Sequence, residues 1–121
     1  MEVPNRSELH TLLNDFLEYL VVERSLSVLT VRNYRHYLTR FLTWMESKPV
    51  TLLPKNINIE LIGQFRIYLA NLKDRNDSLL QKATQTYHIV ALRSFLRYLN
   101  VRRDIPVLNP DKLTFQRPIH G

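Results

Sequence analysis

Four segments of this chain repeat apolar residues at steps of three and four, the spacing of one buried face of an α-helix. The segments cover residues of about 7–24, 27–46, 58–72 and 82–101. Only two glycines occur among the 121 residues, and no alternating stretch is long enough to predict a strand. The sequence therefore predicts a single all-α domain of four helices, followed by a short turn near Asp111–Leu113 and an extended tail.

The segment 27–46 shows this pattern most clearly. Ser27 is a residue type that caps helix N-termini. At 100° per residue the large apolar side chains share one arc, and Arg32, Arg35 and His36 share the opposite arc with Arg40 at its edge. One face of this helix is suited to a core and the other to solvent or to an anion.

Charge is distributed unevenly along the chain. The formal net charge is +6 and the isoelectric point is about 9.9. Residues 24–45 and 78–103 contain no acid at all, although the chain has 11, and they contain Lys82 and eight arginines. Because a solvated face usually carries both signs, we expect the second and fourth helices to form a cationic, acid-free surface. Nucleic acid is the first partner class and an anionic membrane surface the second, with a basic protein lacking such a partner as the alternative.

Several function classes are excluded by missing residue types. The chain has no cysteine, so disulfides, thiolate catalysis and cysteine-bearing zinc sites are impossible. Glycine-rich phosphate loops are absent, and no group of histidines and carboxylates has metal-ligand spacing. We expect no cofactor and no metal. No apolar run approaches a membrane span, which predicts a cytoplasmic protein without a membrane partner.

Polar side chains along the second and fourth helices fit phosphate and groove binding. Arginine and lysine neutralise phosphates, while hydroxyls, amides and helix N-termini donate hydrogen bonds to phosphate oxygens. A helix also fits the major groove of duplex DNA. The candidate DNA contacts are Ser27, Thr30, Arg32, Asn33, Arg35, His36, Thr39, Lys82, Thr84, Thr86, Arg93 and Arg97.

Some of these candidates have a purely structural alternative. Ser27 and Thr84 can cap their helices, which is compatible with phosphate contact. His36 can simply be solvated, and Arg93 can pair with an acid of another helix. The helix dipole explains Arg102 and Arg103 without DNA.

Several aromatic residues and His88 fit the core better than a site. We expect the aromatic side chains, which recur at helical spacing, to pack in or at the edge of the core, and we expect His88 to be partly buried. The residues concerned are Tyr19, Tyr34, Trp44, Tyr68, His88 and Tyr98.

Three stretches, in order, carry a resemblance: "LSVLTVRNYRHYLTRFLTWM", "ATQTYHIVALRSFLRYL" and "NPDKL". They resemble the N-terminal core-binding domain of the tyrosine recombinases, the phage-integrase or Xer-like group. The resemblance implies a SAM-like four-helix fold that forms half of a clamp on a recombination site, with its second and fourth helices toward the major groove. It also implies recombinase protomers as partners in a synaptic tetramer. The matching positions are Ser27, Thr30, Tyr34, Leu38, Phe41, Thr84, Ala91, Leu92, Arg93, Phe95, Tyr98, Leu99, Asn109 and Pro110.

The catalytic residues of that family lie in a separate C-terminal domain. They include a His-x-x-Arg motif, and this chain contains none. We therefore expect a non-catalytic binding domain of a longer site-specific recombinase, with a natural stand-alone domain as the alternative. The competing function is a basic helical protein-interaction domain with no DNA role, and a small stand-alone enzyme is disfavoured by the missing motifs.

Overall fold

The first three helices begin at a residue whose side chain accepts a hydrogen bond from a backbone N–H of the first turn. The computed structural model describes residues 7–114. Ser7, Ser27 and Asn58 precede the first three helices, and each side-chain oxygen accepts from the N–H three residues later. The fourth helix follows Gln81 without a side-chain cap. The helices are α1 (Glu8–Val22), α2 (Val28–Glu46), α3 (Ile59–Ala70) and α4 (Lys82–Val101).

The predicted all-α class is confirmed, since residues 7–114 contain four α-helices and no strand beyond one isolated bridge between Lys73 and Leu79. The 3-10 turn η1 (Pro54–Asn56) interrupts the connection between α2 and α3. The turn predicted near residue 111 is the 3-10 turn η2 (Pro110–Lys112). The extended tail predicted after it falls almost wholly outside the described residues. No helix in the described part of the chain is both long and apolar enough to span a bilayer.

One phenylalanine from each helix lies at the centre of the core. Phe16, Phe41, Phe65 and Phe95 are each at most 1% exposed. The rings of Phe16 and Phe95 lie 5.5 Å apart, and those of Phe41 and Phe65 lie 5.0 Å apart. Trp44 is also buried and packs on Phe65. These contacts join α1 to α4 and α2 to α3, and the ring of Phe16, 6.4 Å from that of Tyr34, links the two pairs. They confirm Trp44 as a core residue.

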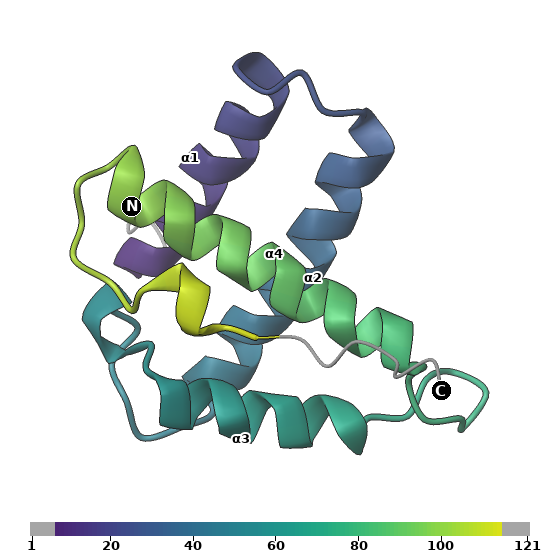
Figure 1. Ribbon diagram of the computed structural model, residues 1–121. Helices are drawn as coiled ribbons and strands as arrows, with labels where there is room; N and C mark the ends of the chain where they lie inside the picture. The colour runs from purple at the N-terminus through teal and green to yellow at the C-terminus, as the bar shows by residue number, and fades with distance from the viewer. Residues whose placement is uncertain (1–6, 115–121) are drawn as a thin grey trace, which may run out of the picture.

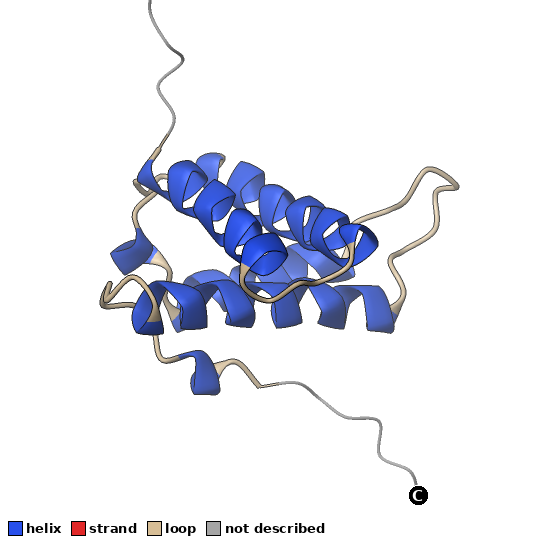
Figure 2. Ribbon diagram, turned by 90° about the horizontal axis from the view of Figure 1, so that it is seen from above, coloured by secondary structure: helices blue, strands red, loops and turns tan. Residues whose placement is uncertain are grey.

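The helices are arranged as an antiparallel pair crossed by a third. α1 and α2 lie side by side, α4 crosses both, and α3 runs below α4 (Figure 1). Seen from above, α4 lies between the α1–α2 pair on one side and η2 on the other (Figure 2). This arrangement gives α4 one face toward the core and an opposite face that meets η2.

α1 and α4 end with the same backbone turn. Around Ser25, whose φ is 52°, the Leu26 N–H donates to the Leu20 carbonyl. Around Asp104, whose φ is 54°, the Ile105 N–H makes the equivalent bond to the carbonyl six residues back. Such a bond across a left-handed residue satisfies carbonyls that the end of a helix leaves unpaired.

Candidate nucleic-acid interface

The N-terminal half of α2 presents two cations whose charge is not cancelled. The side chains of Arg32 and Arg35 are exposed. None of the ion pairs formed within residues 7–114 involves either guanidinium. At the start of the same helix, the Ser27 hydroxyl accepts from the Thr30 N–H at 3.1 Å and donates to the Thr30 hydroxyl at 2.9 Å. The prediction that Ser27 caps the helix is confirmed.

The remaining α2 candidates are exposed and polar. Asn33, His36 and Thr39 are all open to solvent. Partial burial of the ring and the nearby charge of Arg40 lower the pKa of His36 below its ordinary value of 6.5. His36 is therefore mostly neutral at pH 7, where it can exchange hydrogen bonds with a ligand but adds little charge.

The middle of α2 meets the first turns of α4 at a buried histidine. His88 is only 1% exposed. Its Nδ1 lies 2.7 Å from the Thr84 carbonyl oxygen, and its Nε2 lies 3.0 Å from Nη1 of Arg40. The ring packs 4.5 Å from that of Tyr37 and 6.3 Å from that of Phe65. This contact places His36, whose ring is 6.5 Å from His88, beside the N-terminal part of α4.

The hydrogen bonds of His88 fix its protonation state. A carbonyl oxygen only accepts and a guanidinium only donates, so Nδ1 carries the hydrogen and Nε2 is the acceptor of a neutral ring. Burial lowers the pKa of His88 to about 4, the charges of Arg40 and His36 act in the same direction, and the bond to Thr84 opposes them. His88 is thus neutral at pH 7.

Thr84 does not cap α4. The helix begins two residues earlier, at Lys82, so Thr84 is the third residue of the first turn, and its side chain is half-buried. The alternative that Thr84 is an N-cap is therefore wrong. Its carbonyl oxygen nevertheless has a structural role, because it accepts a hydrogen bond from Nδ1 of His88.

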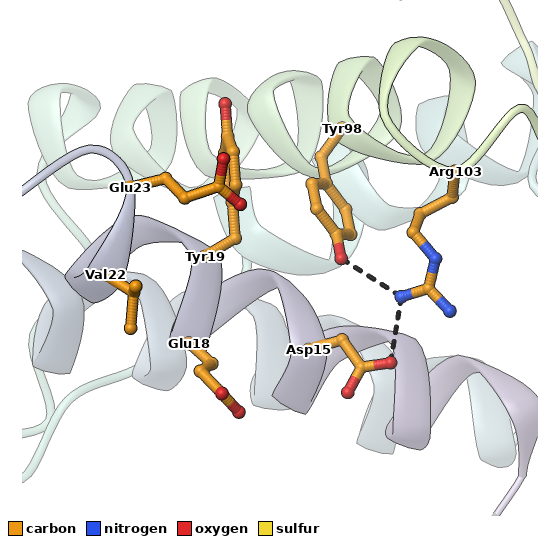
Figure 3. A pocket seen from close by; sticks show the side chains of 7 residues that line it. All are labelled: Asp15, Glu18, Tyr19, Val22, Glu23, Tyr98 and Arg103. Atoms are coloured by element: carbon orange, nitrogen blue, oxygen red, sulfur yellow. Dashed lines mark hydrogen bonds and ion pairs between the residues drawn. The ribbon is translucent and has the colours of Figure 1, made fainter.

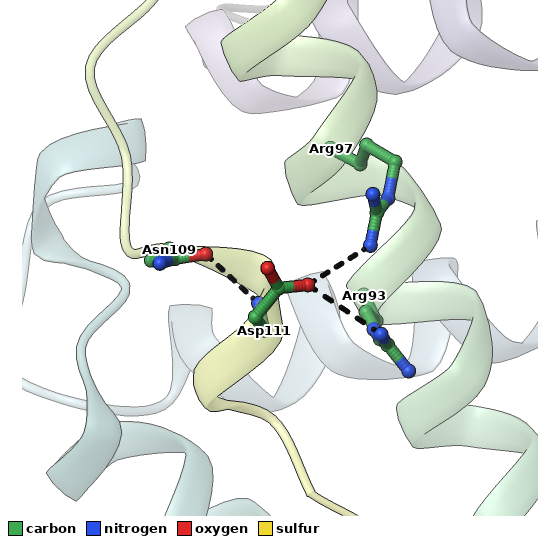
Figure 4. A network of polar contacts seen from close by, with 4 residues as sticks. All are labelled: Arg93, Arg97, Asn109 and Asp111. Carbon is green, nitrogen blue, oxygen red and sulfur yellow. Dashed lines mark hydrogen bonds and ion pairs between the residues drawn. The ribbon is translucent and has the colours of Figure 1, made fainter.

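The outer face of α4 contacts a carboxylate from outside the two acid-free stretches, residues 24–45 and 78–103. Arg97 and Arg93 approach the same Oδ1 of Asp111, at 3.2 Å and 3.5 Å (Figure 4). The N–H of Asp111 donates to the Asn109 side chain at 2.9 Å, which fixes the start of η2. The expectation of an acid-free surface is wrong on this helix, because η2 brings a carboxylate from outside both windows. Two guanidiniums and one carboxylate leave a single net positive charge.

Two further α4 candidates share this outer face. At 100° per residue, Lys82 and Thr86 fall with Arg93 and Arg97 within about 60° of arc. Lys82 is exposed and Thr86 is half-buried. The internal pairing considered for Arg93 is present, with an acid from a 3-10 turn in place of one from another α-helix.

The cations at the end of α4 bind acids of α1. Arg102 pairs with Glu23, and Nη1 of Arg103 donates to Asp15 at 2.8 Å and to the Tyr98 hydroxyl at 3.0 Å (Figure 3). The bonds to Asp15 and Tyr98 raise the pKa of Arg103 above its ordinary value. The helix dipole alone is therefore an incomplete account of these two arginines.

A shallow hollow surrounds the Arg103 contact, and its lining carries more acid than base. Besides Asp15, Tyr98 and Arg103 it includes Glu18, Tyr19, Val22 and Glu23 (Figure 3). A polyanion would be repelled by these carboxylates. This side of the molecule is therefore unsuited to nucleic acid.

The structure thus divides the predicted site residues into three groups. His36 and Thr84 lie near His88, where α2 and α4 cross. Arg93 and Arg97 share Asp111 on the outer face of α4. The first turn of α2, at the N-terminal end of that helix, lies away from the crossing (Figure 1). Sequence reasoning did not include Arg40 among the candidates. Its position at the edge of the polar arc was the only local signal, because its partner His88 is 48 residues away.

Comparison with known proteins adds a family to this geometry. Residues 13–103 match the family described as phage integrase, N-terminal SAM-like domain. The chain is 35% identical over 91 residues to a tyrosine recombinase XerD of Lacticaseibacillus casei, covering 75% of this chain and 28% of that protein. It is 32% identical over 99 residues to a tyrosine recombinase XerD of Oceanobacillus iheyensis, covering 81% and 31%.

A third relative is a tyrosine recombinase XerC of Anoxybacillus flavithermus, 31% identical over 98 residues, with 81% of this chain and 30% of that protein covered. The chain therefore spans about three-tenths of the length of these curated relatives. No solved structure matches the chain at a comparable level.

Proposed function

This chain belongs to the family of phage-integrase N-terminal SAM-like domains, and on that premise we propose that it binds duplex DNA as the non-catalytic domain of a site-specific tyrosine recombinase. In this proposal α2 and α4 approach the recombination site and hold it, in the cytoplasm, together with other recombinase protomers in a synaptic tetramer. The chain itself carries no chemistry of strand exchange.

The outer face of α2 is the observation that carries the proposal. Arg32 and Arg35 are exposed, and none of the ion pairs within residues 7–114 involves them. Two like charges three residues apart on a helix repel each other slightly, and a bound anion would relieve that repulsion. A DNA backbone supplies that anion with a regular spacing.

The proposed contacts are the residues that the sequence indicated, distributed over the two helices. Those on α2 are exposed, with Thr30 half-buried. On α4, Arg93 and Arg97 lie at the Asp111 contact and Thr84 lies beside His88. The proposed contacts are Ser27, Thr30, Arg32, Asn33, Arg35, His36, Thr39, Lys82, Thr84, Thr86, Arg93 and Arg97.

A salt titration with a matched pair of variants tests the proposal. The double variant Arg32→Ala/Arg35→Ala removes two charges from the outer face of α2. The control Lys48→Ala/Lys55→Ala removes the same charge from the connection after α2, where Lys48 lies over the Trp44 ring at 5.0 Å. We expect the first variant to weaken duplex binding by about 100-fold and to lower the log–log salt slope by about two. The control should change both quantities far less.

Two outcomes of that titration would count against DNA binding. Equal losses in both double variants would mean that net charge alone matters and that α2 has no special place. A parent chain without salt-dependent duplex affinity would remove the DNA function and favour the protein-interaction alternative.

One observation does favour that alternative as a second candidate. Four apolar side chains around the α1–α2 turn are exposed, and exposed apolar groups of this kind occur at protein interaction sites. The residues, with their exposed fractions, are Val21 at 53%, Val22 at 69%, Val28 at 85% and Leu29 at 56%.

We also expect the chain to leave DNA strands intact, because it contains no His-x-x-Arg motif. Incubation with a nicked suicide substrate should give no covalent adduct. An adduct on a denaturing gel would contradict the non-catalytic assignment.

A further inference from the structure

The α2–α4 crossing contains a chain of hydrogen bonds packed against aromatic rings. It runs from the Thr84 carbonyl through both nitrogens of His88 to the guanidinium of Arg40. Tyr37 and Phe65 pack against the imidazole ring, and His88 is almost completely buried. A buried imidazole with both nitrogens bonded has a single orientation, so it presents a fixed acceptor to Arg40.

The acceptor that holds Arg40 is neutral. The carbonyl at one nitrogen and the guanidinium at the other leave only the uncharged ring with its hydrogen on Nδ1. An arginine held by a carboxylate loses most of its net charge to the pair, whereas an arginine held by a neutral ring keeps it. Arg40 therefore retains a full positive charge in a defined place.

Arg40 has donors left over for a ligand. A guanidinium has five N–H groups, and the bond to His88 uses one. The ion pairs within residues 7–114 do not include Arg40, and the nearest titratable neighbours, His36 and His88, are neutral at pH 7. The side chain is half-buried, so its position is restricted while part of it is accessible to solvent.

We propose that His88 is a positioning residue that holds the guanidinium of Arg40 at the α2–α4 crossing as a contact for a DNA backbone phosphate. This inference rests on the proposed duplex binding. It adds Arg40 as a residue that contacts the phosphate and His88 as a residue that acts through Arg40. Holding the long arginine side chain before binding reduces the conformational entropy lost when the phosphate arrives.

A double-mutant cycle in the described chain tests this pair. The variants are Arg40→Gln, His88→Leu and their combination, each measured for duplex affinity and for the slope of affinity against salt. We expect each single variant to weaken binding by about tenfold and to lower the slope by about one, which corresponds to one phosphate. The combined variant should bind no more weakly than Arg40→Gln alone, because His88 has no other route to the DNA.

A conservative variant and a packing control separate positioning from stability. His88→Gln keeps an oxygen that can accept from Arg40 and an N–H that can donate to Thr84, so it should recover most of the affinity and the slope. Ile89→Val removes a buried methyl group from the adjacent residue of α4. It should lower the thermal midpoint while leaving the affinity and the slope at the values of the parent.

The outcomes distinguish this inference from the proposed function. A parent chain that binds no duplex overturns both. A parent that binds duplex, with losses in Arg40→Gln and His88→Leu that are absent or simply additive, overturns the role of His88 alone. A loss of affinity in Ile89→Val equal to that in His88→Leu also overturns it, because reduced packing would then explain the result.

Discussion

Arginines at two places on this domain are held in different ways. At the α2–α4 crossing Arg40 is bonded to the neutral ring of His88, and on the outer face of α4 Arg93 and Arg97 share the carboxylate of Asp111. Only the contact with His88 leaves the charge of its arginine uncancelled. Both regions therefore orient guanidiniums, but they differ in electrostatic potential.

The two regions also differ in how strongly they are fixed. His88 is 1% exposed, so its hydrogen bonds are partly shielded from water and salt. The side chain of Asp111 is 71% exposed, and those of Arg93 and Arg97 are 36% and 53% exposed. An ion pair in this setting is weak and screened, so an incoming anion can replace the carboxylate at small cost. The comparison indicates a permanent contact at the crossing and an exchangeable one on the outer face of α4.

The largest expected effect concerns acid and the buried ring. The pKa of His88 is about 4 in the folded chain and near 6.5 when the ring is free in water. The unfolded chain therefore binds the proton first, and the contribution to stability is complete above pH 6.5 and is lost as pH falls toward 4. We expect the free energy of unfolding to drop by about 3 kcal/mol across this range from His88 alone.

Urea unfolding at a series of pH values in the parent and in His88→Leu measures this effect. Every other ionisable group is present in both proteins, so the difference between the two curves isolates His88. Parallel curves would show that the ring is charged or solvated in the folded chain, and the contrast with Asp111 would disappear.

The second effect concerns the carboxylate on the outer face of α4. Asp111→Asn removes one negative charge next to Arg93 and Arg97, and we expect duplex affinity at low salt to rise by about fivefold with a slightly steeper salt slope. Glu18→Gln, which removes the same charge from α1, should leave affinity nearly unchanged. A lower affinity in Asp111→Asn would mean that the carboxylate orients the two arginines for binding and does not compete with DNA.

The smallest effect is on stability. Because all three partners are at least one-third exposed, Asp111→Asn should change the free energy of unfolding by less than about 1 kcal/mol. Chemical denaturation at pH 7 measures it. A loss of several kcal/mol would show that the outer-face contact is as firmly built as the one at the crossing.

The features that sequence predicted are those set by neighbours along the chain. Ser27 caps its helix as its position indicated, and the polar and apolar arcs of α2 lie where the period of 3.6 puts them. Two of the predicted contacts, Thr30 and Thr84, each occupy the third position of their helix, α2 and α4 respectively. Only the first of these helices has a side-chain cap.

The features that sequence missed are contacts between distant segments. Asp111 reaches Arg93 and Arg97 because a proline-containing chain turns back over α4, and no local pattern fixes the direction of that turn. The bond between Arg40 and His88 depends on where two helices cross. Counting acids by window could not detect either contact, since side chains pair by distance in space.

The matching ends of α1 and α4 have a consequence for engineering. Ser25 and Asp104 adopt left-handed backbone angles, which a side chain disfavours by about 1 kcal/mol and which glycine adopts freely. Neither position is among the groups assigned to the anion. Glycine at both turns would therefore raise the thermal stability of the fold without altering the cationic helices.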